Sequence, residues 1–185
     1  MMVWTVGHST HPFERFVALL VTHEIAQVTD VRSVPRSRRH PHFDTDALAR
    51  SLPERGLAYV HLPRLGGWRH ARADSPNGGW RNLSFRGYAD YAMCEEFAAG
   101  LAQLREIAAA GRTAVMCSEA LWWRCHRRLI ADRLLVAGDT VHHIGSGGQL
   151  AAHRLTSFAT VEPDGQLTYP TACSRRRGGQ EVTRR

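Results

Sequence analysis

Hydrophobic positions along the chain alternate between short runs typical of strands and longer runs typical of helices. The first run, Val3 to Val6, is rich in β-branched residues, as strands are. Four apolar side chains then follow at the i, i+3, i+4, i+7 spacing of one helix face: Phe13, Phe16, Val17 and Leu20. Because this alternation continues to about residue 144, the pattern favours a mainly parallel sheet covered by helices.

The whole pattern predicts an α/β fold, a single three-layer domain over residues 1–173 with helices on both faces of a mainly parallel sheet. The sheet has about five strands, which are Val3–Val6, Gln27–Val31, Leu57–Leu62, Thr113–Cys117 and Thr140–Ile144. After a first helix that begins near Pro12, three further helices are predicted, which are Asp44–Arg55, Tyr88–Ala110 and Trp123–Ala137. Residues 145–170 form a small appendage, with a hairpin across Pro163-Asp164-Gly165.

Residues 63–87 show neither the hydrophobic periodicity of a strand nor that of a helix. This insert holds five Gly, five Arg and two Trp, and it contains the turn signal Pro76-Asn77-Gly78-Gly79. Loops of this length are uncommon inside a compact domain. The insert is therefore either a lid over a functional site or the place of a short element that the pattern conceals.

The composition of the chain limits the classes of protein to which it can belong. The chain has 185 residues, 43% of them hydrophobic, with a formal net charge of +7. All of its basic residues are Arg, so chemistry that needs a Schiff-base or P-loop lysine is excluded. The longest apolar run, Phe16 to Val21, is too short to span a membrane, and no signal peptide opens the chain. We therefore expect a cytoplasmic protein with reduced thiols and no membrane partner, and a flexible basic tail over residues 174–185.

Polar residues follow the predicted strands. Since the carboxyl ends of parallel strands meet at one edge of a sheet, these residues should gather there. They are His8 after the first strand, Asp30, Arg32 and Arg36 at the second, Gly66 and Gly67 after the third, Cys117 and Glu119 at the fourth, and His143 in the fifth. Cys125, His126 and Arg127 open the next helix, where the helix dipole favours a thiolate or a bound anion.

Six segments in this order resemble a bacterial family known only as domain of unknown function DUF488. They are Gly7-His8-Ser9; Asp30-Val31-Arg32 with Pro35, Ser37 and Phe43; Leu65-Gly66-Gly67; Met116-Cys117-Ser118-Glu119; Cys125-His126-Arg127; and Val141 with His143-Ile144. The resemblance covers about residues 3–170. It implies a compact α/β domain of cytoplasmic bacterial proteins and assigns no chemistry.

The residues themselves suggest an enzyme with a reactive cysteine that binds a small anionic or nucleotide-like ligand. The proposed reactive set is Cys117, Glu119, His8 and His126, and the proposed ligand-binding set is Asp30, Arg32, Arg36, Arg127, Gly66, Gly67 and His143. Asp30 and Arg32 lie two residues apart on one face of a strand end. They therefore form either a mutual ion pair or an anion site in which Asp30 orients Arg32.

Other interpretations stay open at this point. Cys117 and Cys125 can be buried packing residues, and Cys117 can belong to a sulfur carrier of the rhodanese type. A metal ion can be held by Cys117, Cys125, His126, His8 and His143, although their spacing matches no zinc motif and no cofactor is indicated. Nucleic acid is a further candidate partner, bound by the Arg-rich segment 36–42, the basic tail and the aromatic residues Trp68, Trp80 and Phe85.

Overall fold

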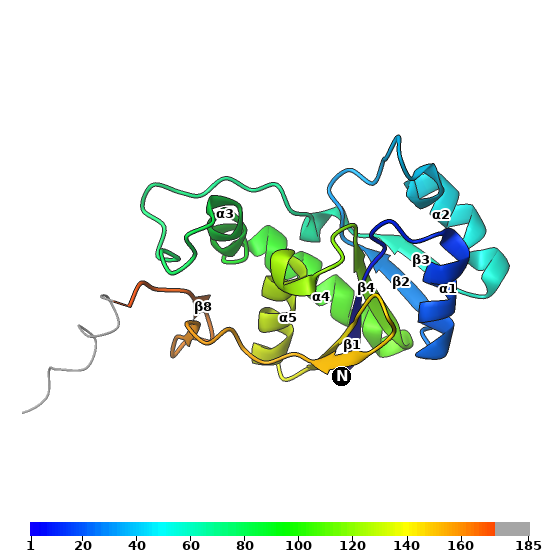
Figure 1. Cartoon of the computed structure of the whole chain (residues 1–185). Coiled ribbons are helices and arrows are strands. Elements are labelled where there is room, and N and C mark those ends of the chain that lie inside the picture. Colours follow the sequence, from blue (N-terminus) through cyan, green and yellow to red (C-terminus); the bar gives the residue numbers. More distant parts are fainter. Residues whose placement is uncertain (173–185) are drawn as a thin grey trace, which may run out of the picture.

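The chain folds around one twisted sheet (Figure 1). The computed structural model describes residues 1–172. Within them, six strands lie in the order β3-β2-β4-β1-β5-β6. The strands are β1 (Met2–Gly7), β2 (Gln27–Asp30), β3 (Ala58–His61), β4 (Thr113–Cys117), β5 (Thr140–Ile144) and β6 (Leu150–Ala152). The first five run parallel, and β6 pairs antiparallel with β5. The predicted α/β fold with a mainly parallel sheet is confirmed.

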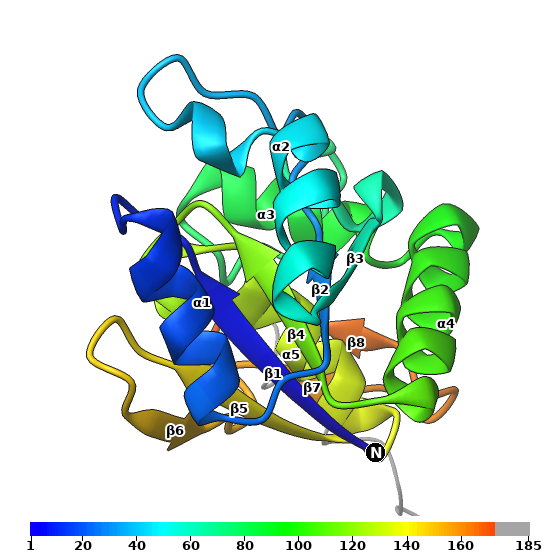
Figure 2. The ribbon, with the colours of Figure 1, turned by 90° about the vertical axis from the view of Figure 1, so that its right-hand side faces the viewer.

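Helices cover both faces of the sheet, as predicted. Figures 1 and 2 show α1 (Phe13–Thr22) and α2 (Thr45–Ser51) on one side, with α3 (Leu83–Tyr91), α4 (Glu95–Ala110) and α5 (Arg127–Val136) on the other. The alternation of strand side chains explains the two cores. Val3 and Val115 pack in the core beneath α3, α4 and α5, whereas Val6 and Met116 pack in the core beneath α1 and α2.

Three predicted helices have different bounds, each for a local reason. The predicted helix Tyr88–Ala110 is wrong as one element, because the chain leaves helical geometry at Cys94 and Arg133 donates to the freed carbonyl of Ala92 at 2.7 Å. The predicted helix Asp44–Arg55 is shorter, because α2 ends at Ser51 and Pro53 begins a separate 3-10 helix, η2 (Pro53–Arg55). The helix predicted over Trp123–Ala137 begins later than expected, because a 3-10 turn, η4 (Trp122–Arg124), precedes α5.

The insert over residues 63–87 conceals two elements. It begins with the 3-10 helix η3 (Pro63–Leu65), and it ends inside α3. Asn82 caps α3, because its side-chain oxygen accepts from the backbone N–H groups of Ser84 and Phe85. The cap is a short polar signal that a search for apolar periodicity passes over.

The remaining elements are small. A fourth 3-10 helix, η1 (Pro41–Phe43), leads into α2, and the predicted hairpin is present as β7 (Thr160–Val161) and β8 (Leu167–Thr168). Residues 145–170 also supply β6, so this segment extends the central sheet as well as forming an appendage. In the part of the chain described, no helix has both the length and the apolar character needed to cross a membrane. The predicted basic tail, 174–185, lies outside the described residues.

Candidate functional site

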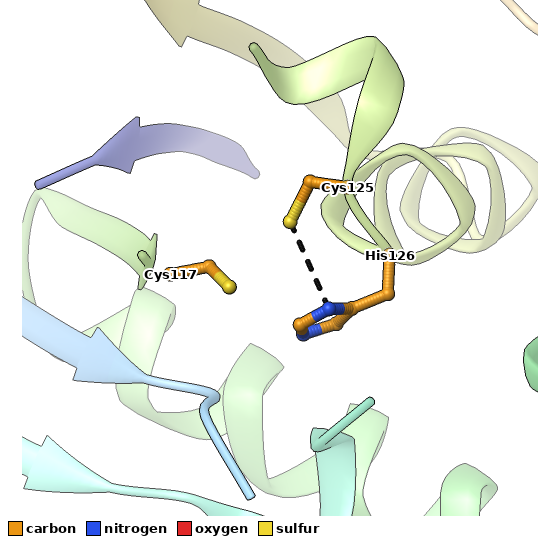
Figure 3. A group of neighbouring side chains, drawn as sticks. All are labelled: Cys117, Cys125 and His126. Carbon is orange, nitrogen blue, oxygen red and sulfur yellow. Dashed lines mark hydrogen bonds between the residues drawn. The ribbon is translucent and has the colours of Figure 1, made fainter. Parts of the chain in front are cut away.

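Two cysteines and a histidine meet at the carboxyl edge of the sheet (Figure 3). Cys117 is the last residue of β4, while Cys125 and His126 lie between η4 and α5. The ligand-capable atoms of the three side chains all lie within 4.8 Å of one another, and Cys125 Sγ is 3.7 Å from His126 Nδ1. Cys125 and His126, eight and nine positions after Cys117 in the chain, therefore join it in one cluster at the edge of the sheet.

Arg127 lies directly behind this cluster and is completely buried. Its Nε donates to Cys125 Sγ at 3.3 Å, and its NH2 group donates to the backbone carbonyl of Glu119. Within residues 1–172 it forms no ion pair with a carboxylate. Since a buried charge is costly unless paired, the sulfur of Cys125 is the group placed to act as its counter-ion.

The two thiols differ in acidity. Burial raises the pKa of Cys125, but a hydrogen bond with Cys117 and the charge and hydrogen bonds of Arg127 outweigh burial and lower the pKa to about 6. The pKa of Cys117 is raised well above its usual value by its hydrogen bond to Cys125 and by burial. Cys125 is therefore the more acidic of the two thiols, and Cys117 is the less acidic one.

His126 completes the cluster in a defined orientation. Its Nε2 lies 3.3 Å from the carbonyl oxygen of Val31, which can only accept, so Nε2 carries the proton. Burial, the largest cause, lowers the pKa of His126, and the Nδ1 atom of its ring faces Cys125 Sγ. Gly67 packs against this nitrogen, because a Cβ at position 67 would lie 3.1 Å from Nδ1.

The cluster forms the floor of a half-open cavity of about 350 Å³, here called the cysteine pocket. Its walls include the aromatic side chains of Phe85 and Tyr88 from α3. Glu119 and Arg124 are exposed at its rim, and the side chain of Arg124 has no hydrogen-bond or ion-pair partner among residues 1–172. The pocket thus offers a thiolate, an aromatic wall and an unpaired guanidinium.

Trp68 stands at the mouth of the cysteine pocket. Its side chain is 85% exposed, and its backbone has a φ of 58°, a left-handed conformation that bulky residues rarely adopt. Backbone strain of this kind is concentrated at ligand-binding sites. Gly67 and Trp68 therefore shape one side of the pocket.

A second polar cluster, here called the Asp30 network, is centred on the other face of the same edge, and its member Arg32 also lines the cysteine pocket. Asp30 is completely buried and accepts from Arg32 Nε at 2.9 Å and from Tyr59 at 2.9 Å. Arg32 also donates to the carbonyl of Phe43 at 2.7 Å. The geometry therefore favours the mutual ion pair over an anion site, because the guanidinium of Arg32 is already occupied.

His8 belongs to the Asp30 network. Its Nδ1 donates to the carbonyl of Ser9 at 2.9 Å, so its Nε2 accepts from Arg32 at 3.1 Å. Burial and the charge of Arg32 lower the pKa of His8 to about 4. His8 is thus a neutral acceptor that holds Arg32 in place, and it does not line the cysteine pocket.

His143 lies in a third environment. Its Nδ1 is 2.7 Å from Thr5 Oγ1, its Nε2 is 3.0 Å from His153 Nδ1, and its ring stacks on Trp122 at 3.8 Å. Burial is the largest cause that lowers the pKa of His143 to about 3, and the neighbouring His153 and Arg127 lower it further. His153 in turn contacts the buried carboxylate of Asp132 at 2.9 Å. This chain of polar side chains is enclosed in the core and does not reach the pocket.

The predicted site residues therefore separate into groups. Those that line the cysteine pocket are Cys117, Glu119, His126, Gly67 and Arg32, with Arg127 behind its floor. Those that do not are His8, Asp30, Gly66, His143 and Arg36. Gly66 packs against Ser33, and Arg36 lines a separate hollow with Asp44 and Asp46. Of the five predicted metal ligands, only Cys117, Cys125 and His126 come together.

Sequence reasoning did not place Cys125, Arg124 or Trp68 in the ligand site. The helix start at Cys125, His126 and Arg127 was expected to favour a thiolate or a bound anion, with packing and metal binding as alternatives for Cys125. The reactive set nevertheless named Cys117 and not Cys125. Nothing in the spacing marks Trp68 or Arg124.

Fold and site together define a three-layer α/β protein with a thiol and imidazole cluster at the carboxyl edge of its sheet. The family model described as domain of unknown function DUF488 matches residues 12–134, more than half of the chain. The chain belongs to this family. The match includes both cysteines of the pocket but neither His8 nor His143. No curated protein and no solved structure gave a match to the chain.

Proposed function

We propose that this chain is an enzyme that uses Cys125 as a thiolate nucleophile on a small ligand with a negatively charged group. The observation that supports this most is the pairing of the buried guanidinium of Arg127 with Cys125 Sγ at 3.3 Å. A thiolate, and not a thiol, is the reactive form of cysteine. The nucleophile is thereby moved from Cys117, the residue expected from the sequence, to Cys125.

The other groups of the pocket have roles that follow from their positions. Arg124, exposed and unpaired within the described residues, would bind the negative group of the ligand. His126, neutral and 3.7 Å from the sulfur, and Glu119 at the rim can donate or accept a proton during the reaction. Phe85 and Tyr88 provide an apolar surface for the rest of the ligand.

Two alkylating reagents that differ in charge test this proposal. Iodoacetamide is neutral and iodoacetate is an anion of nearly the same size, so the ratio of their rates at Cys125 reports the charge of the pocket. We expect Arg124→Gln to slow iodoacetate about two- to fivefold, the effect of one exposed charge interaction, and to leave iodoacetamide unchanged. Peptide mass spectrometry assigns each modification to Cys94, Cys117, Cys125 or Cys173.

The matched control is Arg36→Gln, which removes an arginine that does not line this pocket. It should leave both rates unchanged. The proposal is contradicted if Cys125 reacts with neither reagent at pH 7 in the folded protein. It is equally contradicted if elemental analysis finds a stoichiometric metal ion that the Cys125→Ser variant lacks, since a thiolate bound to a metal would then explain the cluster.

A further inference from the structure

The second cysteine of the pocket has no role in a mechanism that needs one nucleophile. Cys117 is 5% exposed, as is Cys125, and their sulfur atoms lie within 4.8 Å of each other. Both residues are free cysteines and both line the pocket. The thiol of Cys117 thus places a second reactive group directly beside the first.

We propose that Cys117 and Cys125 form a two-thiol redox centre that reduces hydroperoxides and closes to a Cys117–Cys125 disulfide. The inference rests on the proposed function, because it takes Cys125 as the attacking thiolate. It names the reacting group of the ligand as a hydroperoxide, R–O–O–H, in which R carries the negatively charged group bound by Arg124. Hydrogen peroxide is the smallest neutral probe of this chemistry.

In the first step the Cys125 thiolate attacks the terminal oxygen of the hydroperoxide. The S–O bond forms, the O–O bond breaks, and the leaving alkoxide takes a proton from solvent or from a protonated group at the pocket rim. Cys125 is oxidised to a sulfenic acid, and the hydroperoxide is reduced to an alcohol or to water. Arg127 remains hydrogen-bonded to the sulfur from behind, on the side away from the cavity.

In the second step Cys117 attacks the sulfur of the Cys125 sulfenic acid. The S–S bond forms, the S–O bond breaks, and hydroxide leaves with the proton of the Cys117 thiol as water. The sum is one thiolate, one thiol, one hydroperoxide and one proton going to a disulfide, an alcohol and water. A dithiol reductant, which takes the two electrons back to the protein, would restore both thiols.

The site has the features that this sequence of steps requires. The two sulfur atoms come from separate elements, the end of β4 and the turn before α5, and lie within 4.8 Å of each other (Figure 3). Closing the disulfide therefore needs the sulfur atoms to approach by less than about 3 Å. The cavity is half open and apolar along Phe85 and Tyr88, so a small neutral hydroperoxide can reach the floor. Cys94, at the start of α4, has no thiol partner among the residues described, and it offers an internal reference.

The experiment treats the folded full-length chain with one equivalent of hydrogen peroxide at pH 7 and maps the cysteines by peptide mass spectrometry. We expect a Cys117–Cys125 disulfide, two hydrogens lighter than the free pair, to form at least about tenfold faster than Cys94 is oxidised. Cys117→Ser should instead accumulate a sulfenic acid at Cys125 that a dimedone-type probe traps. Cys125→Ser should give neither product, and Cys94→Ser should behave as the unaltered chain.

Circular dichroism of each Ser variant confirms that the fold is retained, and tert-butyl hydroperoxide as a second oxidant tests whether the alkyl group is accepted. The inference is overturned if peroxide leaves both thiols free or if Cys125 is oxidised without ever joining Cys117. When either result occurs while iodoacetamide still alkylates Cys125 readily, the redox centre fails and the proposed nucleophile stands. When alkylation fails as well, both proposals fall together.

Discussion

Two polar clusters lie at the same edge of one sheet, yet they differ in how completely their groups are paired. In the Asp30 network, Asp30, Arg32 and His8 all direct their hydrogen bonds to one another or to nearby backbone and Tyr59. In the cysteine pocket, the floor consists of groups that face a cavity, and the rim carries Arg124, which has no side-chain partner among residues 1–172. Completed pairing is typical of structural ion pairs, whereas groups left open are typical of reactive sites.

The sheet itself separates the two clusters. Asp30 is two residues after Val28, which packs beneath α1 and α2, while Cys117 is two residues after Val115, which packs beneath α3, α4 and α5. Since strand side chains alternate between faces, the two residues end adjacent strands but face opposite ways. A common edge therefore serves as a structural support on one face and as a reaction site on the other.

The largest expected effect comes from breaking the Asp30 network. Asp30→Asn keeps the shape of the side chain but leaves Arg32 buried without a negative partner. We expect it to lower the free energy of unfolding by about 3–5 kcal/mol, the usual cost of removing one partner of a buried ion pair. Guanidinium denaturation measures the free energy of unfolding. Glu119→Gln, at the exposed rim of the pocket, is the control and should change stability by less than about 0.5 kcal/mol; equal losses in both would refute the contrast.

The pH dependence of stability comes next in size. The folded-state pKa of His8 is about 4 and that of His143 about 3, both below the usual 6.5, so the unfolded chain binds protons that the folded chain does not. Their contribution is complete above pH 6.5 and is lost as pH falls toward pH 4 for His8 and toward pH 3 for His143. We expect a loss of about 1.4 kcal/mol per pH unit per histidine within these windows.

Denaturation of the unaltered chain and of His8→Gln at pH 7, 5.5 and 4.5 isolates the share of His8. The glutamine oxygen can still accept from Arg32 but does not titrate. The difference in stability between the two proteins should therefore shrink or reverse as pH falls. A difference that stays constant over this range would show that the pKa of His8 is not lowered in the folded state.

A third prediction concerns the pairing of Arg127 with Cys125. Arg127→Met removes the positive charge, so the pKa of Cys125 should rise from about 6 toward the ordinary value near 8.5. The thiolate fraction at pH 7 then falls from about nine tenths to a few per cent, and alkylation by iodoacetamide slows about thirtyfold. Arg127→Lys, which keeps a positive charge, should slow alkylation by a smaller factor. Equal rates in all three folded proteins would contradict the assigned role of Arg127.

The smallest effect is expected at the pocket mouth. Trp68→Gly relieves the left-handed backbone at a side chain that is 85% exposed, and should stabilise the fold by up to about 1 kcal/mol. Trp123→Gly is the control, because Trp123 is also exposed but does not line the pocket and has no positive φ. Thermal unfolding compares the two, and a gain in Trp123→Gly equal to that in Trp68→Gly would refute strain as the cause.

The sheet was predictable because hydrophobic periodicity reports burial directly, and the five parallel strands follow from it. The break between α3 and α4 was not, since Ala92, Met93 and Cys94 are compatible with a helix and the break depends on tertiary contacts such as that of Arg133 with Ala92. The short strand β6 was missed because three residues at the sheet's rim, all exposed, carry no alternating pattern.

For the site, the sequence predicted which residues reach the edge but not how they share partners. Asp30 and Arg32 were seen as either an ion pair or an anion site, and the choice depends on the carbonyl of Phe43 and on His8, which come from other segments. The preference of Arg127 for Cys125 likewise depends on Arg127 being buried with no carboxylate in reach. Such facts belong to three-dimensional packing and cannot be read from spacing.

The central claim is that Cys125 is a thiolate at neutral pH because Arg127 lies against it. Ultraviolet absorbance of the thiolate, followed by pH titration of the folded chain and of Cys125→Ser, measures this directly. We predict a transition with a midpoint at about pH 6 that disappears in Cys125→Ser. If the two titrations coincide, with every thiol ionising near ~8.5 or above, the account of the cysteine pocket is wrong.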